Sequence, residues 1–168
     1  MESKYYVPEI SEFYVGFEFE YRDPAWEGRE EFQPCVVKDS QTLRFTTNLN
    51  SIDGFNEVDF EHLLSNIEYE IAHNNIRVKY LDTSDIEEEG FKFVGKEEYL
   101  FEKDIDEYSH LEVDFDPEEL TIVITELYQA KLTARILHRE TREYNVLFNG
   151  KIKNKSEFKK VLKMLDIK

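Results

Sequence analysis

Hydrophobic and polar residues alternate along several short segments of the chain, which is the pattern of half-buried β-strands. In residues 14–21, aliphatic and aromatic side chains occupy the odd positions, and Glu18 and Glu20 stand between them. Similar segments follow one another in the second half of the chain: FKFVG, EYLFEKD, SHLEVDF, LTIVITELY, LTARILH and EYNVLF. This series predicts antiparallel strands that pack one face on a core and expose the other face to water.

Two hairpins are predicted by the turn signals between these segments. A two-residue turn after Asp116 would pair positions whose numbers add to 235, with Val113 opposite Ile122. A three-residue loop further along the chain would set Ala134 opposite Val146 in the same way. Both pairings align the alternating apolar residues of their two strands, so we interpret the second half of the chain as an antiparallel meander.

Three segments have helical spacing. Residues 57–74 are predicted to form the main internal helix, and a short helix is predicted with Ser84 as its N-cap and Gly90 as its terminator. A terminal helix would be capped by Asn154 or Ser156, and lysines cover its polar side. The apolar stripe of the internal helix consists of Phe60, Leu63, Leu64, Ile67 and Ile71. The apolar stripe of the terminal helix consists of Phe158, Val161, Leu162 and Leu165.

The length of 168 residues suits one compact domain, and 40% hydrophobic residues are enough for a folded core. We therefore expect residues 1–168 to form a single α+β domain. Its antiparallel β-meander sheet would have about five to seven strands, packed by a central helix and a C-terminal amphipathic helix. Residues 22–56 contain Pro24, Gly28 and Pro34, which break regular structure. Of all parts of the chain, this is the one whose secondary structure the sequence specifies least.

The net charge of −16 is divided unevenly along the chain. Residues 129–168 contain 11 Lys and Arg against 4 Asp and Glu, a balance of +7, so the other 128 residues have a balance of −23. The terminal lysines could meet phosphate groups, but the acidic body would repel a nucleic acid. We favour contact between these lysines and an acidic surface, either the protein's own or a partner's. Alternatively, the acidic body could imitate a nucleic acid and occupy a DNA-binding protein of the host.

One row of side chains suggests a metal site. Four residues project from the same face of one predicted strand, with about 6.6 Å between neighbours of the row: His110, Glu112, Asp114 and Asp116. Oxygen ligands are those that Mg²⁺ and Mn²⁺ prefer, so neighbours in this row could share a cation. However, a row on a single strand diverges, whereas metal sites gather ligands from several elements. We therefore favour the interpretation of this row as a solvated sheet face.

A second set of carboxylates lies earlier in the chain. Glu18 and Glu20 share a face of their predicted strand, and Asp82 and Asp85 could join them if the fold gathers all four. Such a group could bind a metal or act in acid and base catalysis. Nothing in the sequence requires this gathering, so surface carboxylates are the favoured interpretation.

Other catalytic signatures are missing from the sequence. His62 and His73 are 11 residues apart on the predicted internal helix, about 16 Å of rise, so they cannot bind one zinc ion together. His110 and His138 complete the histidines, and surface positions are favoured for all four. Cys35 is the only cysteine and is interpreted as a packed or unreactive thiol. The chain also lacks the serine-hydrolase elbow, the dinucleotide-binding fingerprint and the Walker phosphate loop.

Three phrases of the sequence resemble a known group of proteins: KYYVPEISEFYVGFEFE, IRVKYLDTSDIEEEGF and FNGKIKNKSEFKKVLKML. They are similar to small uncharacterised proteins of bacteriophages and mobile elements of gut Bacteroidota. These phrases have no known chemical meaning, so the resemblance assigns no catalytic residue. It implies a small protein made inside a bacterial cell, and accessory roles that depend on binding host or viral proteins.

The leading functional expectation is a non-enzymatic binding or regulatory protein that contacts another protein and uses no cofactor. Tyr5, Tyr6, Phe13, Tyr14 and Trp26 are candidate anchors, because aromatic residues contribute much of the energy of protein interfaces. The alternatives are a carboxylate-based metal-dependent hydrolase and the nucleic-acid mimic. We expect a cytoplasmic location and no membrane association, since the sequence contains neither an apolar signal segment nor 18 consecutive apolar residues.

Overall fold

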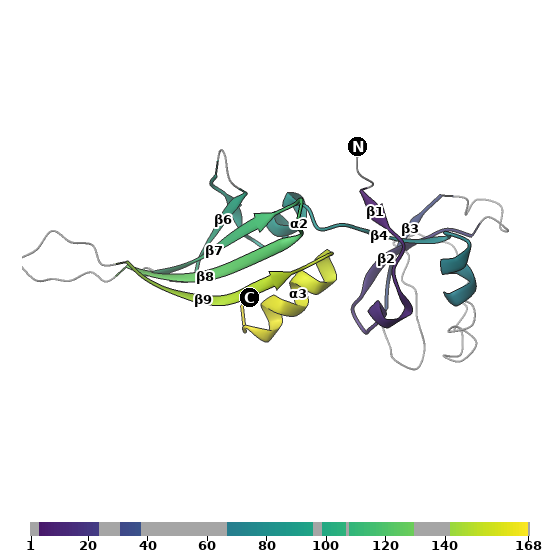
Figure 1. Ribbon diagram of the computed structural model, residues 1–168. Helices are drawn as coiled ribbons and strands as arrows, with labels where there is room; N and C mark the ends of the chain where they lie inside the picture. The colour runs from purple at the N-terminus through teal and green to yellow at the C-terminus, as the bar shows by residue number, and fades with distance from the viewer. Residues whose placement is uncertain are drawn as a thin grey trace, which may run out of the picture. The chain divides into compact units, whose positions relative to one another are not determined.

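The computed structural model describes residues 4–23, 31–37, 67–95, 99–106, 108–129 and 142–167 (Figure 1). The chain divides into two compact units, residues 1–80 and residues 81–168. Each unit has an antiparallel sheet and a hydrophobic core of its own. The α+β class with antiparallel sheets is thus confirmed, but the strands form two sheets where the sequence led us to expect one.

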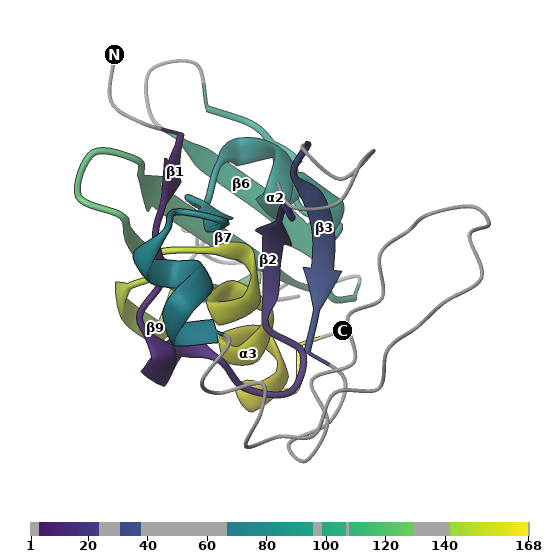
Figure 2. The ribbon, with the colours of Figure 1, turned by 90° about the vertical axis from the view of Figure 1, so that its right-hand side faces the viewer.

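The first unit is built on a four-stranded sheet with the strand order β1-β4-β2-β3, and Figure 2 labels β1, β2 and β3. The strands are β1 (Tyr5–Tyr6), β2 (Glu18–Tyr21), β3 (Gln33–Val36) and β4 (Ile76–Lys79), and a short 3-10 helix, η1 (Ile10–Glu12), follows β1. The predicted alternation around β2 is confirmed, because Phe17 and Phe19 are buried while Glu18 and Glu20 are only half-buried. The core consists of Phe17, Phe19, Cys35, Val37, Ile67, Ile76 and Val78.

The predicted internal helix is confirmed in its last part. Residues 67–72 are helical, and Ile67 is buried in the core of the first unit. The helix stops before Asn74, which has a φ of +56°, a left-handed conformation that asparagine adopts more readily than most residues. The start of this helix, in residues 57–66, lies outside the described residues.

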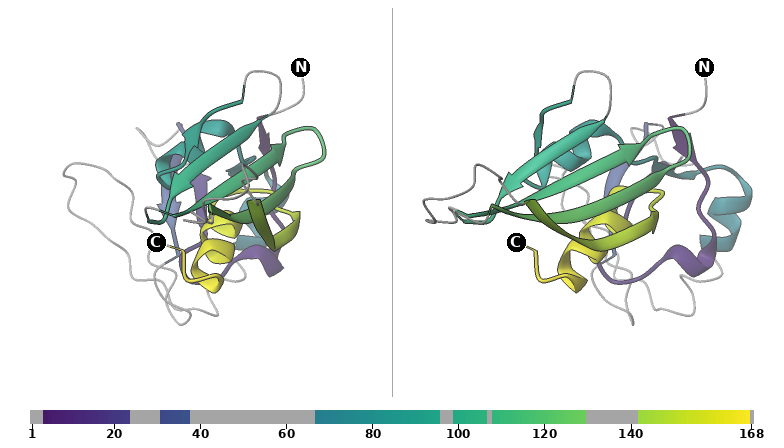
Figure 3. Two further views of the ribbon diagram at one scale, coloured as in Figure 1. Left: turned by 90° about the vertical axis from the view of Figure 1, so that its left-hand side faces the viewer. Right: turned by 60° about the vertical axis from the view of Figure 1, so that its left-hand side comes forward.

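The second unit is built on a five-stranded sheet with the sequential order β5-β6-β7-β8-β9. The strands are β5 (Lys92–Phe93), β6 (Leu100–Asp104), β7 (Ser109–Asp116), β8 (Thr121–Gln129) and β9 (Arg142–Lys151). The described residues of this unit also form two helices, α2 (Thr83–Glu88) and α3 (Lys155–Met164), and Figure 3 shows α3 against one side of the sheet. Phe158 and Leu162 of α3 pack into the same core as Phe115, Ile122 and Ile124 of the sheet. The predicted terminal helix and its apolar stripe are therefore confirmed.

The hairpin of β7 and β8 has a different register from the predicted one. Val113 pairs with Ile124, so partner positions add to 237 and the predicted sum of 235 is wrong. The reason is a four-residue turn, in which the Asp116 side chain accepts hydrogen bonds from the backbone amides of Glu118 and Glu119, and Leu120 has a φ of +54°. Because the shift is an even number of residues, each side chain stays on its predicted face.

Strand β9 pairs with β8, and Val146 lies opposite Thr125. The predicted pairing of Val146 with Ala134 stays a prediction. Residues 130–141, which contain Ala134, lie outside the described residues. A β-bulge between Ile124 and Thr125 lets Leu147 pack against the core beside Phe148.

Each of the helices α2 and α3 begins at a side-chain cap, and ion pairs connect them. The side chain of Asp82 caps α2, so the predicted cap Ser84 is wrong by two residues. Asn154 caps α3, as predicted. Lys155 forms an ion pair with Glu88 of α2, and the Lys159 ammonium lies 3.9 Å from a carboxylate oxygen of Glu89. These two lysines thus contact the protein's own acidic residues, the arrangement that we favoured from the sequence.

Among the described helices, none is long and apolar enough to cross a bilayer.

Candidate functional site

The sheet of the second unit has two chemically different faces. One face points into the core, with Phe101, Leu111, Val113, Ile122 and Ile124 fully or almost fully buried. Side chains alternate along a strand, so the residues between these point away from the core. We call this second side the outer face. Its members on β6 to β9 include Glu102, Asp104, His110, Glu112, Asp114, Val123, Thr125, Leu127, Tyr144 and Val146.

The strand register orders the outer face into rows that run across the sheet. One row is Asp104, His110, Leu127 and Tyr144, and the next row is Glu102, Glu112, Thr125 and Val146. A third row is Leu100, Asp114, Val123 and Asn149. In these three rows the charged side chains belong to β6 and β7, and β8 and β9 supply neutral ones, whereas the row beyond them, Asp116, Thr121 and Lys151, has a basic residue on β9. We call these the acidic half and the neutral half of the outer face.

The neutral half exposes large apolar side chains. Tyr144 is 72% exposed and Val146 is 50% exposed. Leu127 and Val123 on the neighbouring strand are half-buried. Single exposed apolar residues are common, but adjacent ones beside charged residues are typical of interaction surfaces.

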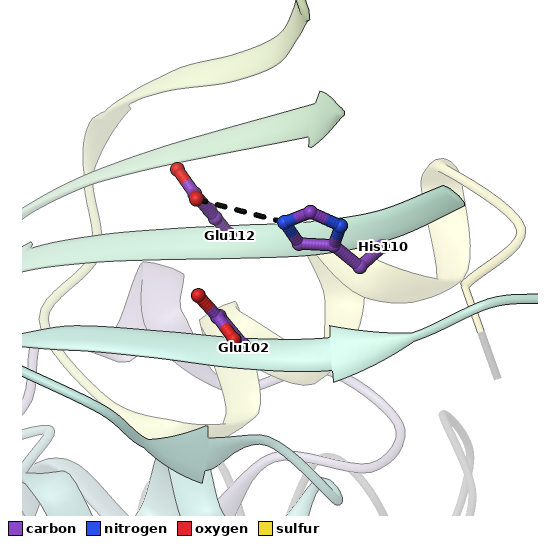
Figure 4. Close-up of side chains that lie close together, drawn as sticks. All are labelled: Glu102, His110 and Glu112. Carbon is purple, nitrogen blue, oxygen red and sulfur yellow. Dashed lines mark ion pairs between the residues drawn. The ribbon is translucent and has the colours of Figure 1, made fainter. Parts of the chain in front are cut away.

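Within the acidic half, Glu102, His110 and Glu112 form a compact group (Figure 4). One ligand atom from each lies within 4.8 Å of the others, and Nε2 of His110 is 3.6 Å from a carboxylate oxygen of Glu112. Glu102 lies directly opposite Glu112 across the two strands, where like charges repel each other. A protonated imidazole or a bound cation would offset this repulsion. One nitrogen and two oxygens are a ligand set that zinc or manganese accepts.

This group corrects part of the sequence interpretation. We expected the row on β7 to diverge, but β6 supplies a third ligand, so Glu102, His110 and Glu112 converge. Asp114 lies on the same face without belonging to the group. The sequence did not identify Glu102 as a candidate, because the pattern alone does not specify the register between β6 and β7. The alternation in EYLFEKD, combined with a turn between β6 and β7, could have placed it opposite Glu112.

The early carboxylates have structural partners instead. Glu20 accepts hydrogen bonds from the Arg77 guanidinium at 2.6 Å. The same guanidinium lies 3.8 Å from the ring centres of Tyr5 and Phe32. Glu18 lies on the same strand, and among the described residues neither glutamate belongs to a group of three or more metal ligands.

Asp82 and Asp85 serve the start of α2. The Asp82 side chain accepts hydrogen bonds from two backbone amides of the first turn, and the Asp85 side chain accepts one from the Asp82 amide. This reciprocal arrangement is a capping box, and it accounts for the position of both carboxylates.

Cys35 lies in the core of the first unit and its thiol is a hydrogen-bond donor to the Gln33 carbonyl oxygen at 3.5 Å. Burial raises the pKa of the Cys35 thiol to about 12, and the nearby Glu20 charge contributes in the same direction. Because the thiolate is the nucleophilic form, this cysteine is unreactive near neutral pH. The interpretation of Cys35 as a packed or unreactive thiol therefore agrees with its environment.

The remaining histidines are placed only in part. His73 lies on the surface of the first unit, with its ring stacked on Tyr69 at 3.9 Å between centres. His62 and His138 lie outside the described residues.

The candidate anchors are half-buried where the structure describes them. The Tyr6 hydroxyl donates a hydrogen bond to Glu12, and its ring packs at a tilt against the ring of Tyr80. Phe13 and Tyr14 pack against the core of the first unit. Tyr5 stacks on the Arg77 guanidinium, as described above, and Trp26 lies outside the described residues. A partner contact through these aromatic residues stays a prediction.

No protein-family description, curated protein or solved structure matches the chain.

Proposed function

We propose that the chain is a non-enzymatic binding or regulatory protein, and that the outer face of the second unit contacts another protein. The observation behind this proposal is the division of that face. Its acidic half can steer and orient a positively charged partner, and its neutral half exposes Tyr144 and Val146 beside it. Protein interfaces combine apolar contact area, rich in aromatic residues, with a polar rim in this way.

The cellular setting belongs to the same proposal. The resemblance to small proteins of bacteriophages and mobile elements supports a role in the host cytoplasm, with a host or viral protein as the partner. Acidic charge would speed the encounter with a basic surface, and it would make binding sensitive to salt.

Affinity capture from a Bacteroides-like lysate tests the proposal. The unchanged chain is compared with Asp114→Lys, which reverses one exposed carboxylate of the acidic half, and with Glu87→Lys, a matched reversal of an exposed carboxylate on α2. We expect the Asp114→Lys variant to lose a captured protein that the Glu87→Lys variant retains. Equal capture by both variants contradicts the use of the outer face. A captured nucleic-acid-binding protein would favour the mimic over a general binding role.

A metal-dependent hydrolase is the second candidate, and the group of Glu102, His110 and Glu112 favours it. Calorimetric titration with Mn²⁺ and Zn²⁺ distinguishes the two candidates. A hydrolase requires binding that is lost in Glu102→Gln and in Glu112→Gln but kept in Asp114→Asn, whose side chain lies outside the group. Binding that is equally weak in all four proteins removes this candidate.

A further inference from the structure

We infer that the occupant of the outer face is a basic amphipathic α-helix of the partner protein. This inference rests on the proposed function, and it specifies the chemistry and the secondary structure of what binds there.

The order of charges across the sheet requires an amphipathic occupant. Neighbouring strands lie about 4.8 Å apart, and a helix with its side chains is about 10–12 Å wide, so one helix covers two or three strands. A helix along the boundary between β7 and β8 would have Glu112 and Asp114 on one flank. On its other flank it would meet Leu127 and Val146. Lys or Arg on the first flank and aliphatic residues on the second would match both halves.

The spacing along the strands fits helical repeats. Acidic side chains recur on β7 at every second residue, at Glu112, Asp114 and Asp116, which is about 6.7 Å per step. Residues four apart in a helix rise about 6.0 Å. Basic residues at two successive positions of this kind would therefore meet Glu112 and Asp114 with less than about 1 Å of mismatch, whereas the Asp116 carboxylate already accepts hydrogen bonds from the turn. Flexible Lys and Arg side chains can take up that difference.

Backbone hydrogen bonding favours a helix over an extended peptide on this face. The outer face offers side chains, whereas the backbone groups of β6, β7 and β8 already pair with one another. An extended peptide laid on it would bury its own N–H and C=O groups without partners, which costs free energy. A helix satisfies these groups internally and presents only side chains.

Electrostatics disfavours two other occupants. A nucleic acid would bring phosphates against Glu102, Asp104 and Glu112. A second copy of the chain would set one acidic half near another, unless it were turned so that unlike halves meet. Self-association is therefore an outcome that the test must detect.

The test uses a synthetic 18-residue helix of lysine and leucine, with its lysines on one face, and a scrambled peptide of the same composition. Both are titrated into the full chain and followed by fluorescence anisotropy. We expect the amphipathic peptide to bind at least about tenfold more tightly than the scrambled one. We also expect its circular dichroism to show helix in the complex.

Four variants locate the binding. Asp114→Lys should weaken it by about tenfold and Glu87→Lys by less than about twofold. Val146→Ser should weaken it by about threefold or more, and Met164→Ser, a matched exposed apolar position on α3, should not. Circular dichroism of each variant checks that it is folded.

The inference is overturned if the two peptides bind equally. It is also overturned if the outer-face variants lose no more peptide affinity than their control variants. Sedimentation that shows a dimer broken by Asp114→Lys would overturn it in favour of a second copy. Either result leaves the proposed function standing if the lysate capture still depends on Asp114, so the two failures can be told apart.

Discussion

The two-faced sheet of the second unit makes opposite predictions for two neighbouring residues of β8. Ile124 has no exposed surface and lies in the core, whereas Thr125 is half-buried on the outer face. Truncating a buried isoleucine to alanine costs about 2–5 kcal/mol, through lost burial and the cavity that remains. We expect about 3 kcal/mol for Ile124→Ala, a large part of the roughly 5–15 kcal/mol that a typical domain has. Thr125→Ala should cost less than about 1 kcal/mol.

Urea unfolding separates these outcomes. With a slope of about 1.5 kcal/mol per molar urea, a loss of 3 kcal/mol lowers the midpoint by about 2 M, against less than about 0.7 M for Thr125→Ala. Far-UV circular dichroism follows the loss of the second unit's strands and helices directly. The shift should therefore appear in the dichroism transition. Equal costs for the two variants would refute the two-faced sheet, and with it the outer face.

Three further predictions concern the strand register and the core of the first unit. Cysteines introduced at Asp114 and Val123, which are directly paired, should form a disulfide on mild oxidation, and a cysteine pair at Asp114 and Thr121, the register with sum 235, should form much less. The raised pKa of Cys35 means that the folded state holds the thiol proton more tightly, so the stability of the first unit should fall as pH rises from 9.0 towards 12. In Cys35→Ala, urea midpoints should lose this part of the pH dependence, and an unchanged dependence would contradict a buried thiol. Arg77→Ala should destabilise the first unit by about 1–2 kcal/mol, because the guanidinium stacks on two rings and also pairs with a glutamate. A decrease in unfolding temperature smaller than the error of the measurement would contradict this.

Local patterns in the sequence predicted the elements well where apolar residues recur regularly. The strands around Phe19 and Val113 and the helix containing Phe158 were predicted because burial of one side imposes the period of the element. The cap at Asn154 was predicted for a similar reason, since its side chain serves only local backbone groups.

Long-range organisation was harder to predict. The register of β7 and β8 depends on whether Leu120 belongs to the turn, and a left-handed leucine is uncommon enough that the sequence does not suggest it. The division into two units depends on which apolar faces meet, and periodicity does not specify this. The same limit applies to the candidate site, because Glu102 joins His110 and Glu112 only through the pairing of β6 with β7.

The most direct measurement is covalent footprinting of exposed tyrosines in the captured complex. Tyr144 on the outer face is 72% exposed, and Tyr69 in the first unit is 58% exposed, so both should be labelled readily in the free protein. If the outer face binds the partner, labelling of Tyr144 should fall strongly on complex formation while labelling of Tyr69 stays unchanged. Protection of Tyr69 with continued labelling of Tyr144 would contradict the account.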